Sequence, residues 1–325
     1  MKVLIIGGDG YIGSRLAEEL DGLGREVAVC DISPHEFNTD TVKHVYIRAK
    51  NLIKPLPDIV ERAVDFKNYD TIIYLAGHSS VPMCNNDPDG AMKNNVDEFR
   101  AILESLADHQ FMIYASTSSI YSQMRQWSAT DPRGFELDGF HPGGIYDTSM
   151  YIRELMARLH NETVAPNTLG LRFGTVCGWS PNWRTDIMIN KMFMSAKENG
   201  ELHIQNPTVE SPILSIEHLC EAVEMILWNH EYDIDHARQL RWGEHPGVIN
   251  LASFNTTVLD IGTTVSNILN VPLRIDTKVS DTYNFVASLD HMREKKLFLN
   301  GKFDAESIVK DIEAHWPIKI KGDRV

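Results

Sequence analysis

Short uninterrupted apolar runs alternate along the first half of the chain with stretches in which apolar residues recur every three or four positions. KVLIIGG at the start, EVAVCD ending at Asp31, and DTIIYLAG at 70–77 are such runs. Segment 11–23, between the first two, has helical periodicity. Continuous apolar runs are typical of parallel strands buried on both faces. The pattern therefore predicts βαβ units and a doubly wound, Rossmann-type α/β sheet.

The same pattern continues to about residue 176. Segment 94–109 has one apolar helical face, and HQFMIYASTSSIY at 109–121 is expected to be a strand that runs into a Ser/Thr turn. Another helix is expected to begin near Tyr146, followed by a strand in NTLGLRFGTV. These elements extend the predicted parallel sheet.

The character of the sequence changes after Gly178, and GWSPNWRTDIMINKMF is rich in Trp, Pro and Asn. SPILSIEHLCEAVEMIL predicts a strand and helix that return to the sheet. We therefore expect an NAD-binding Rossmann domain formed by 1–176 and about 211–252. A smaller C-terminal substrate-binding lobe would comprise about 177–210 and 253–325.

Composition excludes several classes of protein. With 43% hydrophobic and 23% charged residues, the 325-residue chain is globular. A net charge of −14 argues against nucleic acid as a partner, because such binding gathers Lys and Arg against phosphate. The four cysteines lack the spacing of a metal site or disulfide framework. An uninterrupted run of only four apolar residues directly precedes the first glycine, fewer than the ~7 to 15 of a signal peptide. We expect a cytoplasmic protein with no membrane partner and no metal.

Three glycines lie directly after the first apolar run, where a helix is expected to begin. Gly7, Gly10 and Gly13 form GxxGxxG, and Tyr11 and Ile12 open the helix. Glycine permits a tight turn, close approach of the backbone to a pyrophosphate, and close packing of helix on strand. The helix N-terminus also favours negative charge. Glycines end strands for structural reasons too, but this context favours a dinucleotide site.

Asp31 ends the second apolar run, about 20 residues after the glycines, where a carboxylate can bind ribose hydroxyls. A carboxylate there repels a 2′-phosphate, and Ile32 and Ser33 supply no arginine to bind one. The sequence therefore favours NAD over NADP. The alternative is that Asp31 is only a turn or cap residue.

The glycines, Asp31, YLAG, STSSIY and YDTSM follow one another in an order that resembles the extended short-chain dehydrogenase/reductase family. Within it, nucleotide-sugar epimerases and dehydratases are most similar, and the resemblance runs from Met1 to about Ile312. It implies NAD as cofactor and a sugar or nucleotide sugar as substrate. It also implies a homodimer formed through the helices at about 94–109 and 146–161.

The resemblance also implies individual cofactor and substrate contacts. Asn51 and Leu52 stand where relatives bind adenine, and the residues after the third strand form a loop beside the phosphates and nicotinamide ribose. Beyond the glycine loop and Asp31, the implied cofactor contacts are Asn51, Leu52, Leu75, Ala76, Gly77, Asn95, Tyr146 and Met150. The candidate substrate contacts are His78, Ser118, Arg184 and Asn190. For His78, a purely structural role is the alternative.

Thr117 and Tyr146 match the family's catalytic hydroxyl and tyrosine. The Tyr146 hydroxyl would exchange a proton with the substrate oxygen while hydride moves to or from nicotinamide, and Thr117 would hydrogen-bond the same oxygen. The alternative is that Tyr146 is only a buried aromatic residue at a helix start. Unorthodox acid/base chemistry at His141 or Cys177 is a further alternative.

The chain departs from the family pattern at the catalytic lysine, where it has Met150. A cation close to the tyrosine lowers its pKa from ~10, so its loss reduces the ionised fraction at neutral pH. Arg153 lies one turn further along, at a position that is not catalytic in the family. A non-catalytic, NAD-binding or regulatory protein is therefore the alternative to an enzyme.

The substrate side also departs from the family. Ser211 replaces an arginine that pairs with the nucleotide diphosphate in relatives, and Ser118 and Ser119 replace the acidic pair of dehydratases. Candidate replacements for the lost positive charge are Arg172, Arg184, Lys191 and Arg274. These features favour an epimerase or oxidoreductase that transfers hydride at a carbinol carbon. A non-nucleotide substrate is the alternative.

Overall fold

The computed structural model describes most of the 325 residues. The described ranges are 1–31, 43–44, 66–122, 133–134, 143–165, 167–232, 247–276, 282–297 and 303–316.

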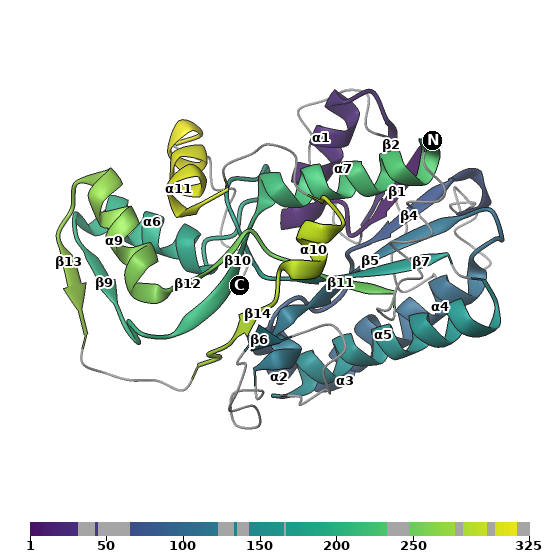
Figure 1. The fold of residues 1–325 in the computed structure, drawn as a ribbon, viewed down its shortest axis with the longest axis horizontal. Coiled ribbons are helices and arrows are strands. Elements are labelled where there is room, and N and C mark those ends of the chain that lie inside the picture. Colours follow the sequence, from purple (N-terminus) through teal and green to yellow (C-terminus); the bar gives the residue numbers. More distant parts are fainter. Residues whose placement is uncertain are drawn as a thin grey trace, which may run out of the picture.

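A seven-stranded sheet, parallel at every pairing, dominates the fold in the order β11-β7-β5-β4-β1-β2-β3 (Figure 1). Its strands are β1 (Lys2–Ile6), β2 (Glu26–Cys30), β3 (Lys43–His44), β4 (Thr71–Tyr74), β5 (Phe111–Thr117), β7 (Thr168–Phe173) and β11 (Val248–Leu251). The strand order reverses between β1 and β4, which is where a Rossmann fold binds its ligand. The predicted doubly wound sheet is confirmed.

Helices cover both faces of this sheet (Figure 1). Helices α1 (Tyr11–Gly22) and α7 (Ile216–Tyr232) pack together on one face, and α4 (Glu98–Ser105) and α5 (Ile145–Thr163) pack together on the other. The short helices α2 (Val81–Asn86) and α3 (Pro88–Met92), with a π-helical turn at Lys93–Asp97, lead into α4. The helix predicted to begin near Tyr146 is α5, which begins at Ile145.

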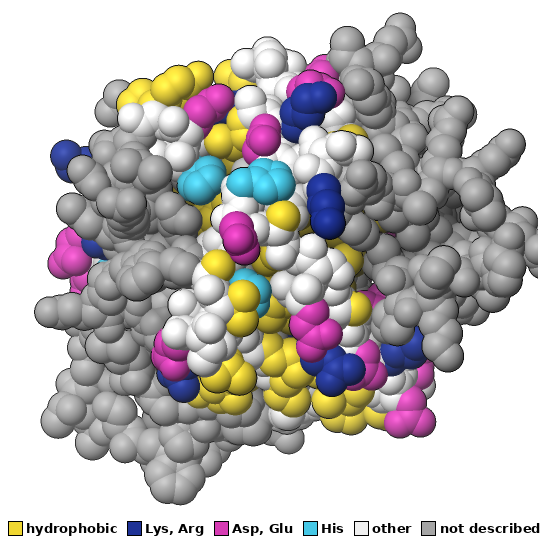
Figure 2. All heavy atoms as spheres, turned by 90° about the vertical axis from the view of Figure 1, so that its right-hand side faces the viewer, with side chains coloured by type: hydrophobic (Ala, Val, Ile, Leu, Met, Phe, Trp, Pro, Cys, Tyr) yellow, Lys and Arg dark blue, Asp and Glu magenta, His cyan; other side chains and the backbone are white. Residues whose placement is uncertain are grey.

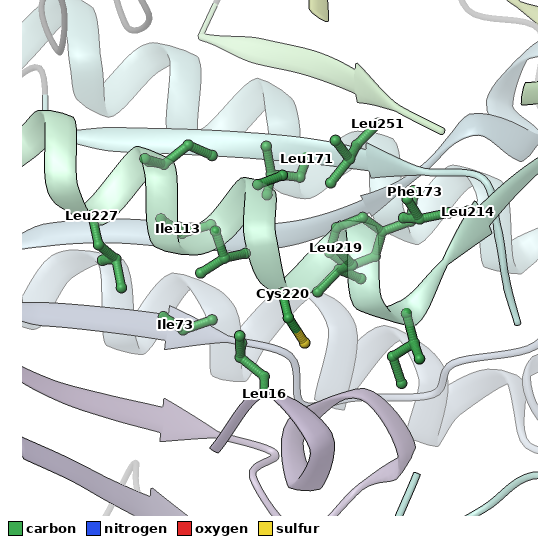
Figure 3. Close-up of a cluster of buried hydrophobic side chains, with 14 of the residues drawn as sticks. Leu16, Ile73, Ile113, Leu171, Phe173, Leu214, Leu219, Cys220, Leu227 and Leu251 are labelled. Carbon is green, nitrogen blue, oxygen red and sulfur yellow. The ribbon is translucent and has the colours of Figure 1, made fainter. Parts of the chain in front are cut away.

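The main core fills the space between the sheet and the helices α1 and α7 (Figure 3). Leu16 of α1 and Leu219 and Leu227 of α7 are fully buried there, opposite Ile73 and Ile113 of the sheet. Burial of aliphatic side chains contributes ~1.5 to 3 kcal/mol each. This packing fixes the start of α1, and with it the glycine-rich turn, against the carboxyl ends of the strands.

The second group of elements contains several smaller sheets and helices. A three-stranded sheet has the order β12-β10-β8, and two-stranded pairs join β13 to β9 and β14 to β6. The elements are β6 (Arg133–Gly134), β8 (Thr175–Cys177), α6 (Met188–Asn199), β9 (Leu202–Ile204), β10 (Glu210–Ser215), β12 (Phe254–Thr257), α9 (Val258–Leu269), β13 (Leu273–Ile275), β14 (Val286–Ala287), α10 (Asp290–Glu294) and α11 (Ala305–Ala314).

The structure corrects one expectation for the segment 211–227. Helix α7 packs on the large sheet as expected, but β10 pairs with β8 and β12 instead of joining that sheet. The chain crosses closely at Gly174, where a Cβ would lie 2.8 Å from the Pro212 carbonyl oxygen. Strand β11 occupies the place beside β7 in the large sheet. The apolar run of β10 predicts a buried strand, but it does not show which sheet that strand joins. The division into two lobes at about residue 176 stays a prediction.

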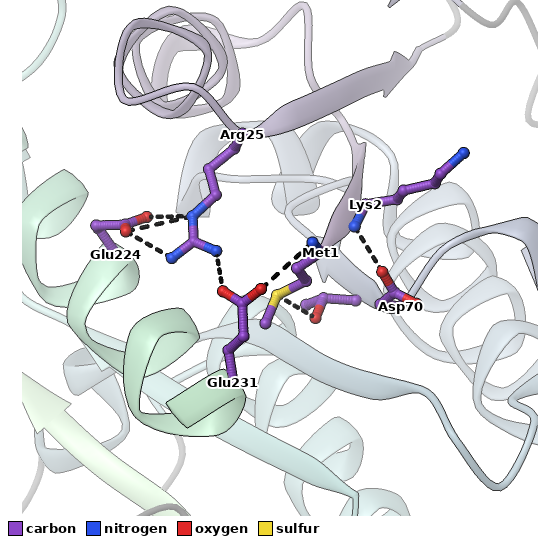
Figure 4. Close-up of polar contacts among 7 residues, drawn as sticks. Met1, Lys2, Arg25, Asp70, Glu224 and Glu231 are labelled. Carbon is purple, nitrogen blue, oxygen red and sulfur yellow. Dashed lines mark hydrogen bonds and ion pairs between the residues drawn. The ribbon is translucent and has the colours of Figure 1, made fainter. Parts of the chain in front are cut away.

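The face seen from the right-hand side of Figure 1 mixes acidic, basic and histidine side chains with hydrophobic ones among its described residues (Figure 2). Figure 4 shows polar contacts that join α7 to the first strands. Arg25 pairs with Glu224 at 2.7 Å and with Glu231, which also lies 3.4 Å from the Met1 amino group. These pairs hold α7 against the residues that precede β1 and β2. Among the helices of the described ranges, none is long and apolar enough to cross a membrane.

Candidate active site at the carboxyl edge of the large sheet

The glycine-rich turn between β1 and α1 forms a cradle that side chains would fill. Gly7 has φ +87°, and a Cβ there would lie 2.7 Å from the Ala76 backbone nitrogen. A Cβ at Gly13 would lie 2.3 Å from the Gly7 carbonyl oxygen. Gly10 begins α1 without a side-chain cap, so the first N–H groups of the helix are left for a ligand. The turn fits the pyrophosphate of a dinucleotide.

Asp31 lies beside this cradle at the end of β2. Its Oδ2 accepts a hydrogen bond of 3.0 Å from the Asp9 backbone nitrogen. The contact holds the carboxylate next to the glycine-rich turn, where it suits an adenosine ribose. The predicted adenine contacts Asn51 and Leu52 lie outside the described residues.

The side chain of Tyr11 points away from the cradle. Its hydroxyl donates to the Gly178 carbonyl at 2.9 Å and accepts from Asn190 at 3.3 Å. Ile12 packs against the main core. These residues can therefore serve a dinucleotide through their backbone N–H groups, while the Tyr11 side chain ties α1 to the loop after β8.

The loop after β4 is held from behind by Asn95. The Asn95 Oδ1 accepts from the His78 backbone nitrogen at 2.8 Å, and its Nδ2 donates to the His78 carbonyl at 3.1 Å. Gly77 has φ +130°, and a Cβ there would lie 2.2 Å from the Asn95 Oδ1. The same amide donates to Ser149 of α5 at 2.9 Å. Asn95 thus couples the loop at 75–78 to the helix that carries Tyr146.

His78 turns its ring toward the short helices that follow this loop. Its Nδ1 lies 3.2 Å from the Asn94 Nδ2, and its Nε2 lies 3.4 Å from the Asp87 Oδ2. Both ring nitrogens therefore have protein partners. A substrate contact at His78 stays a prediction.

Thr117 and Tyr146 meet where β5 ends and α5 begins. The Thr117 side chain lies close enough to the Tyr146 hydroxyl to lower its pKa. Burial raises the pKa of Tyr146, and the Asp147 carboxylate raises it further, whereas the Thr117 hydrogen bond and the Arg153 guanidinium lower it. The pair can hold and protonate one oxygen of a bound molecule.

A polar chain extends from this pair into the protein. The Thr117 Oγ1 lies 2.8 Å from the Ser119 Oγ, and Ser119 donates to Asp147 at 2.5 Å. Tyr283 and the Gly143 backbone nitrogen donate to the other Asp147 oxygen at 2.9 Å and 3.0 Å. Burial raises the pKa of Asp147, while these hydrogen bonds lower it. We did not predict roles for Asp147 and Tyr283, because nothing in the local sequence places residue 283 against residue 147.

Met150 and Arg153 lie on the buried side of α5, about one and two turns after Tyr146. Their exposed fractions are 5% and 1%. Met150 places an apolar side chain one turn from the tyrosine, where it supplies no charge. Arg153 places a guanidinium behind the loop at 76–78, with its Nη2 2.9 Å from the Ala76 carbonyl oxygen.

Comparison with known proteins decides the family. A model described as the NAD dependent epimerase/dehydratase family matches residues 3–236, which is more than half of the chain. The chain belongs to that family. The resemblance inferred from the motif order is thereby confirmed, as is NAD as the cofactor of the family.

Family relatives match over part of their length. Protein CapI of Staphylococcus aureus is 29% identical over 222 residues, or 63% of each chain. A UDP-glucose 4-epimerase of Lactobacillus helveticus is 29% identical over 161 residues, covering 48% of this chain and 46% of that enzyme. The match thus spans less than two thirds of these relatives.

Solved structures of the family share the fold over nearly the whole chain. TunA, an NAD-dependent NDP-hexosamine 5,6-dehydratase, superimposes with a TM-score of 0.76 at 21% identity, covering 97% of both chains. The UDP-glucose 4-epimerase of Thermus thermophilus, in complex with NAD, gives 0.75 at 18% identity and covers 96% of this chain and 99% of that one. These likenesses establish the fold.

Within the family framework, several candidate residues have structural contacts. Ser118 is buried and donates to the Phe173 carbonyl at 2.9 Å. Asn190 is fully buried and fixes the loop after β8, accepting from the Gly178 nitrogen at 3.0 Å and donating to the Arg184 carbonyl at 2.9 Å. Both side chains bond to other protein groups. A substrate contact at Ser118 or Asn190 therefore stays a prediction.

Arg184 differs from these two because it reaches across the site. Its guanidinium donates to the Ser79 Oγ at 3.3 Å and pairs with Asp186 at 2.7 Å. Burial lowers the pKa of Arg184, but Asp186, Tyr11 and Tyr146 together raise it, so the group stays cationic. Its side chain is 30% exposed, and a substrate contact at Arg184 stays a prediction.

Two other candidate site residues are buried in the protein interior. Arg172 is buried and paired with Glu154 at 2.6 Å, so its charge is used in the core. Cys177 is fully buried, and burial raises its pKa to about 12, which leaves it a thiol at neutral pH. Lys191 is exposed, and Arg274 lies 3.7 Å from Glu201 on the surface. His141 lies outside the described residues.

Proposed function

We propose that the chain is an NAD-dependent enzyme that oxidises and re-reduces a carbinol carbon of a sugar, as an epimerase or oxidoreductase. The observation that carries the proposal is that Thr117 and Tyr146 lie close together at the carboxyl edge of the sheet, where the Thr117 side chain lowers the Tyr146 pKa. The glycine-rich cradle that fits a dinucleotide lies at the same edge.

The chemistry of the side chains follows from that placement. Bound NAD supplies a hydride acceptor at its nicotinamide ring. Tyr146 takes the proton from the substrate hydroxyl as its carbon is oxidised, and returns it when the carbonyl is reduced. Thr117 donates to the same oxygen and holds it in place. Proton transfer by a positioned side chain of this kind contributes ~10² to 10⁴ in rate.

A nucleotide-linked sugar is the proposed substrate. Relatives named UDP-glucose 4-epimerase support this class, and so does the partly exposed Arg184 beside the loop at 78–80. An arginine fork suits the paired oxygens of a phosphate. Because Arg172 is committed to Glu154, Arg184 is the better candidate for this contact.

We also propose that the protein is a homodimer formed through α4 and α5. Leu155 and Leu159 of α5 are exposed to 39% and 60%. An apolar stripe on an outward helix face favours pairing with a second copy across a twofold axis.

The second candidate is a non-catalytic NAD-binding member of the family, which is favoured by the apolar Met150 in place of a cation. Stripped protein is titrated with NAD and then screened by thermal shift against UDP-, GDP-, CDP- and dTDP-sugars. The enzyme proposal expects a sugar that both stabilises the protein and is converted. NAD binding with no conversion of any stabilising sugar would favour the second candidate.

A further inference from the structure

Arg153 is an arginine buried in the middle of α5 that forms no ion pair among the described residues. Its exposed fraction is 1%, and none of its hydrogen bonds within the described part of the chain goes to an acid. Its guanidinium instead lies 5.1 Å from the ring centre of Tyr74 and 5.6 Å from that of Phe99. A charge removed from water is costly unless the protein compensates it. The buried carboxyl of Glu98 also lies in its field, where Arg153 lowers the Glu98 pKa, but the two form no ion pair.

Apart from the Ala115 carbonyl of β5, 3.5 Å from the Nη1, the acceptors of Arg153 belong to the loop that follows β4 and to Asn95, which holds that loop. The Nε donates to the Asn95 carbonyl at 2.6 Å, and the Nη2 donates to the Ala76 carbonyl at 2.9 Å and the Asn95 Oδ1 at 3.1 Å. A Cβ at Gly77 would lie 2.5 Å from the Nη2, so the loop is packed directly on the guanidinium. Arg153 therefore supports the loop at 76–78 from the side opposite its exposed surface.

The geometry of α5 brings this charge toward Tyr146. Residues seven apart lie at nearly the same angle around a helix, and ~10.5 Å apart along it. Side chains lean toward the N-terminus of their helix, and the long Arg153 side chain spans much of that separation. Met150 fills the turn between them without a charge.

Several titratable groups surround the Tyr146 hydroxyl. Burial raises the Tyr146 pKa, the Thr117 hydrogen bond lowers it, Asp147 raises it, Arg153 lowers it, and Cys84 of α2 raises it. Arg184 from the loop after β8 and Tyr283 from the segment before β14 also interact with Tyr146. Of the two cations, Arg184 is paired with Asp186. Arg153 is the one whose charge has no acidic partner at contact distance among the described residues.

We propose that Arg153 is a positioning residue for the reaction. It holds the Ala76–His78 loop from behind and supplies the buried positive charge that favours proton uptake from substrate by Tyr146. The inference rests on the proposed role of Tyr146 as the acid and base.

An arginine suits this place better than a lysine. Desolvation lowers the pKa of Arg153, but an arginine keeps its proton in proteins, whereas a buried lysine can lose it. The planar guanidinium also reaches three acceptors on the loop and on Asn95 together. Arg153→Lys is therefore not expected to be a neutral change.

The test separates the charge of Arg153 from its hydrogen bonds. Arg153→Gln keeps donor groups without the charge, and Arg153→Met combined with Met150→Lys moves a cation one turn nearer to Tyr146. Arg158→Met is the matched control, since Arg158 is a half-exposed arginine on the same helix. The Tyr146 titration is followed by NMR of carbon-labelled tyrosine, with the resonance identified by its loss in Tyr146→Phe. Thermal melting confirms that each variant is folded.

The inference predicts that Tyr146 titrates at higher pH in Arg153→Gln than in the parent, and that turnover near pH 7 falls about tenfold and recovers toward pH 10. In Arg158→Met, Tyr146 is expected to titrate as in the parent. In the double variant, the lysine at position 150 is expected to lower the Tyr146 pKa part of the way back to its parent value. An unchanged Tyr146 titration in folded Arg153→Gln would overturn the inference. If Arg153→Gln does not fold, the folded double variant is compared with Met150→Lys alone, and an identical Tyr146 titration in the two would overturn the inference. The titration needs no substrate. Full activity of Tyr146→Phe would therefore defeat the proposed function separately.

Discussion

Tyr146 stands among groups that act on its hydroxyl in opposite directions. Burial and Asp147 disfavour the phenolate, and Thr117 and Arg153 favour it, with a net rise in pKa. The tyrosine and threonine could be predicted from the sequence because each follows a recognisable segment. Asp147, Ser119 and Tyr283 could not, because their contacts join segments far apart in the chain.

The raised Tyr146 pKa predicts an alkaline pH dependence. The proton-accepting form is the phenolate, and a raised pKa leaves less of it at neutral pH. Turnover in the direction of alcohol oxidation should therefore rise with pH across about pH 6 to 10. A rate profile with a maximum below pH 7 would contradict Tyr146 as the base.

Asp31 predicts the choice of cofactor. A carboxylate beside the glycine-rich turn accepts from ribose hydroxyls and repels a 2′-phosphate. Titration of stripped protein should give NAD at least about tenfold tighter than NADP, and Asp31→Asn should narrow the difference. Equal affinity for the two cofactors in the parent would refute this role.

At the scale of elements, the turn from β1 into α1 shows why sequence predicted some features and missed others. The glycine spacing and the strand before it depend on local backbone geometry, so they could be read from the chain. The Tyr11 side chain depends on Gly178 and Asn190, 167 and 179 residues away, and its direction was not predictable. Strand β10 was misplaced for the same reason, because its pairing partners are not local.

Two glycines of α1 give a matched test of the cradle. Gly13→Ala should lower stability by about 1 to 3 kcal/mol and weaken NAD binding, since its Cβ would meet backbone at 2.3 Å. Gly22→Ala has nothing within 4 Å and should gain about 0.5 to 1 kcal/mol without affecting NAD. Chemical denaturation and NAD titration measure both. Equal effects at the two sites would argue against the cradle.

The Glu154–Arg172 pair joins α5 to β7 inside the protein. Glu154→Gln leaves the Arg172 charge buried without its counter-ion and should cost about 3 to 5 kcal/mol. Glu162→Gln on the same helix removes an exposed pair and should cost about 0.5 kcal/mol or less. Urea denaturation compares them, and a small loss for Glu154→Gln would mean that the pair is not a structural link.

At the scale of the whole molecule, the two groups of elements meet at the carboxyl edge of the large sheet. Strand β8 follows β7 after one residue, and β12 follows β11 after two, so the smaller sheet continues directly from that edge. Tyr11, Asn190 and Gly178 bond across it. The fold class was predictable from apolar runs, which record burial on both faces. The pairing of short strands in the smaller group was not, because their sequences carry little periodicity.

The proposed homodimer is a property at this scale. Leu159→Glu places a charge on the outward face of α5 and should convert a dimer to a monomer at micromolar concentration. Light scattering measures the change, with Lys310→Glu on the exposed surface of α11 as a charge control outside the proposed interface. A parent protein that is already monomeric would refute the dimer.

The central claim is that Tyr146 moves the proton while hydride leaves a sugar carbon. The most direct measurement is single-turnover formation of NADH, followed by its absorbance, when NAD-loaded protein is mixed with the nucleotide sugar that stabilises it most. The account predicts NADH formation in the parent and a loss of at least about a hundredfold in Tyr146→Phe, with NAD affinity unchanged. Equal rates of NADH formation in the parent and in Tyr146→Phe would contradict it.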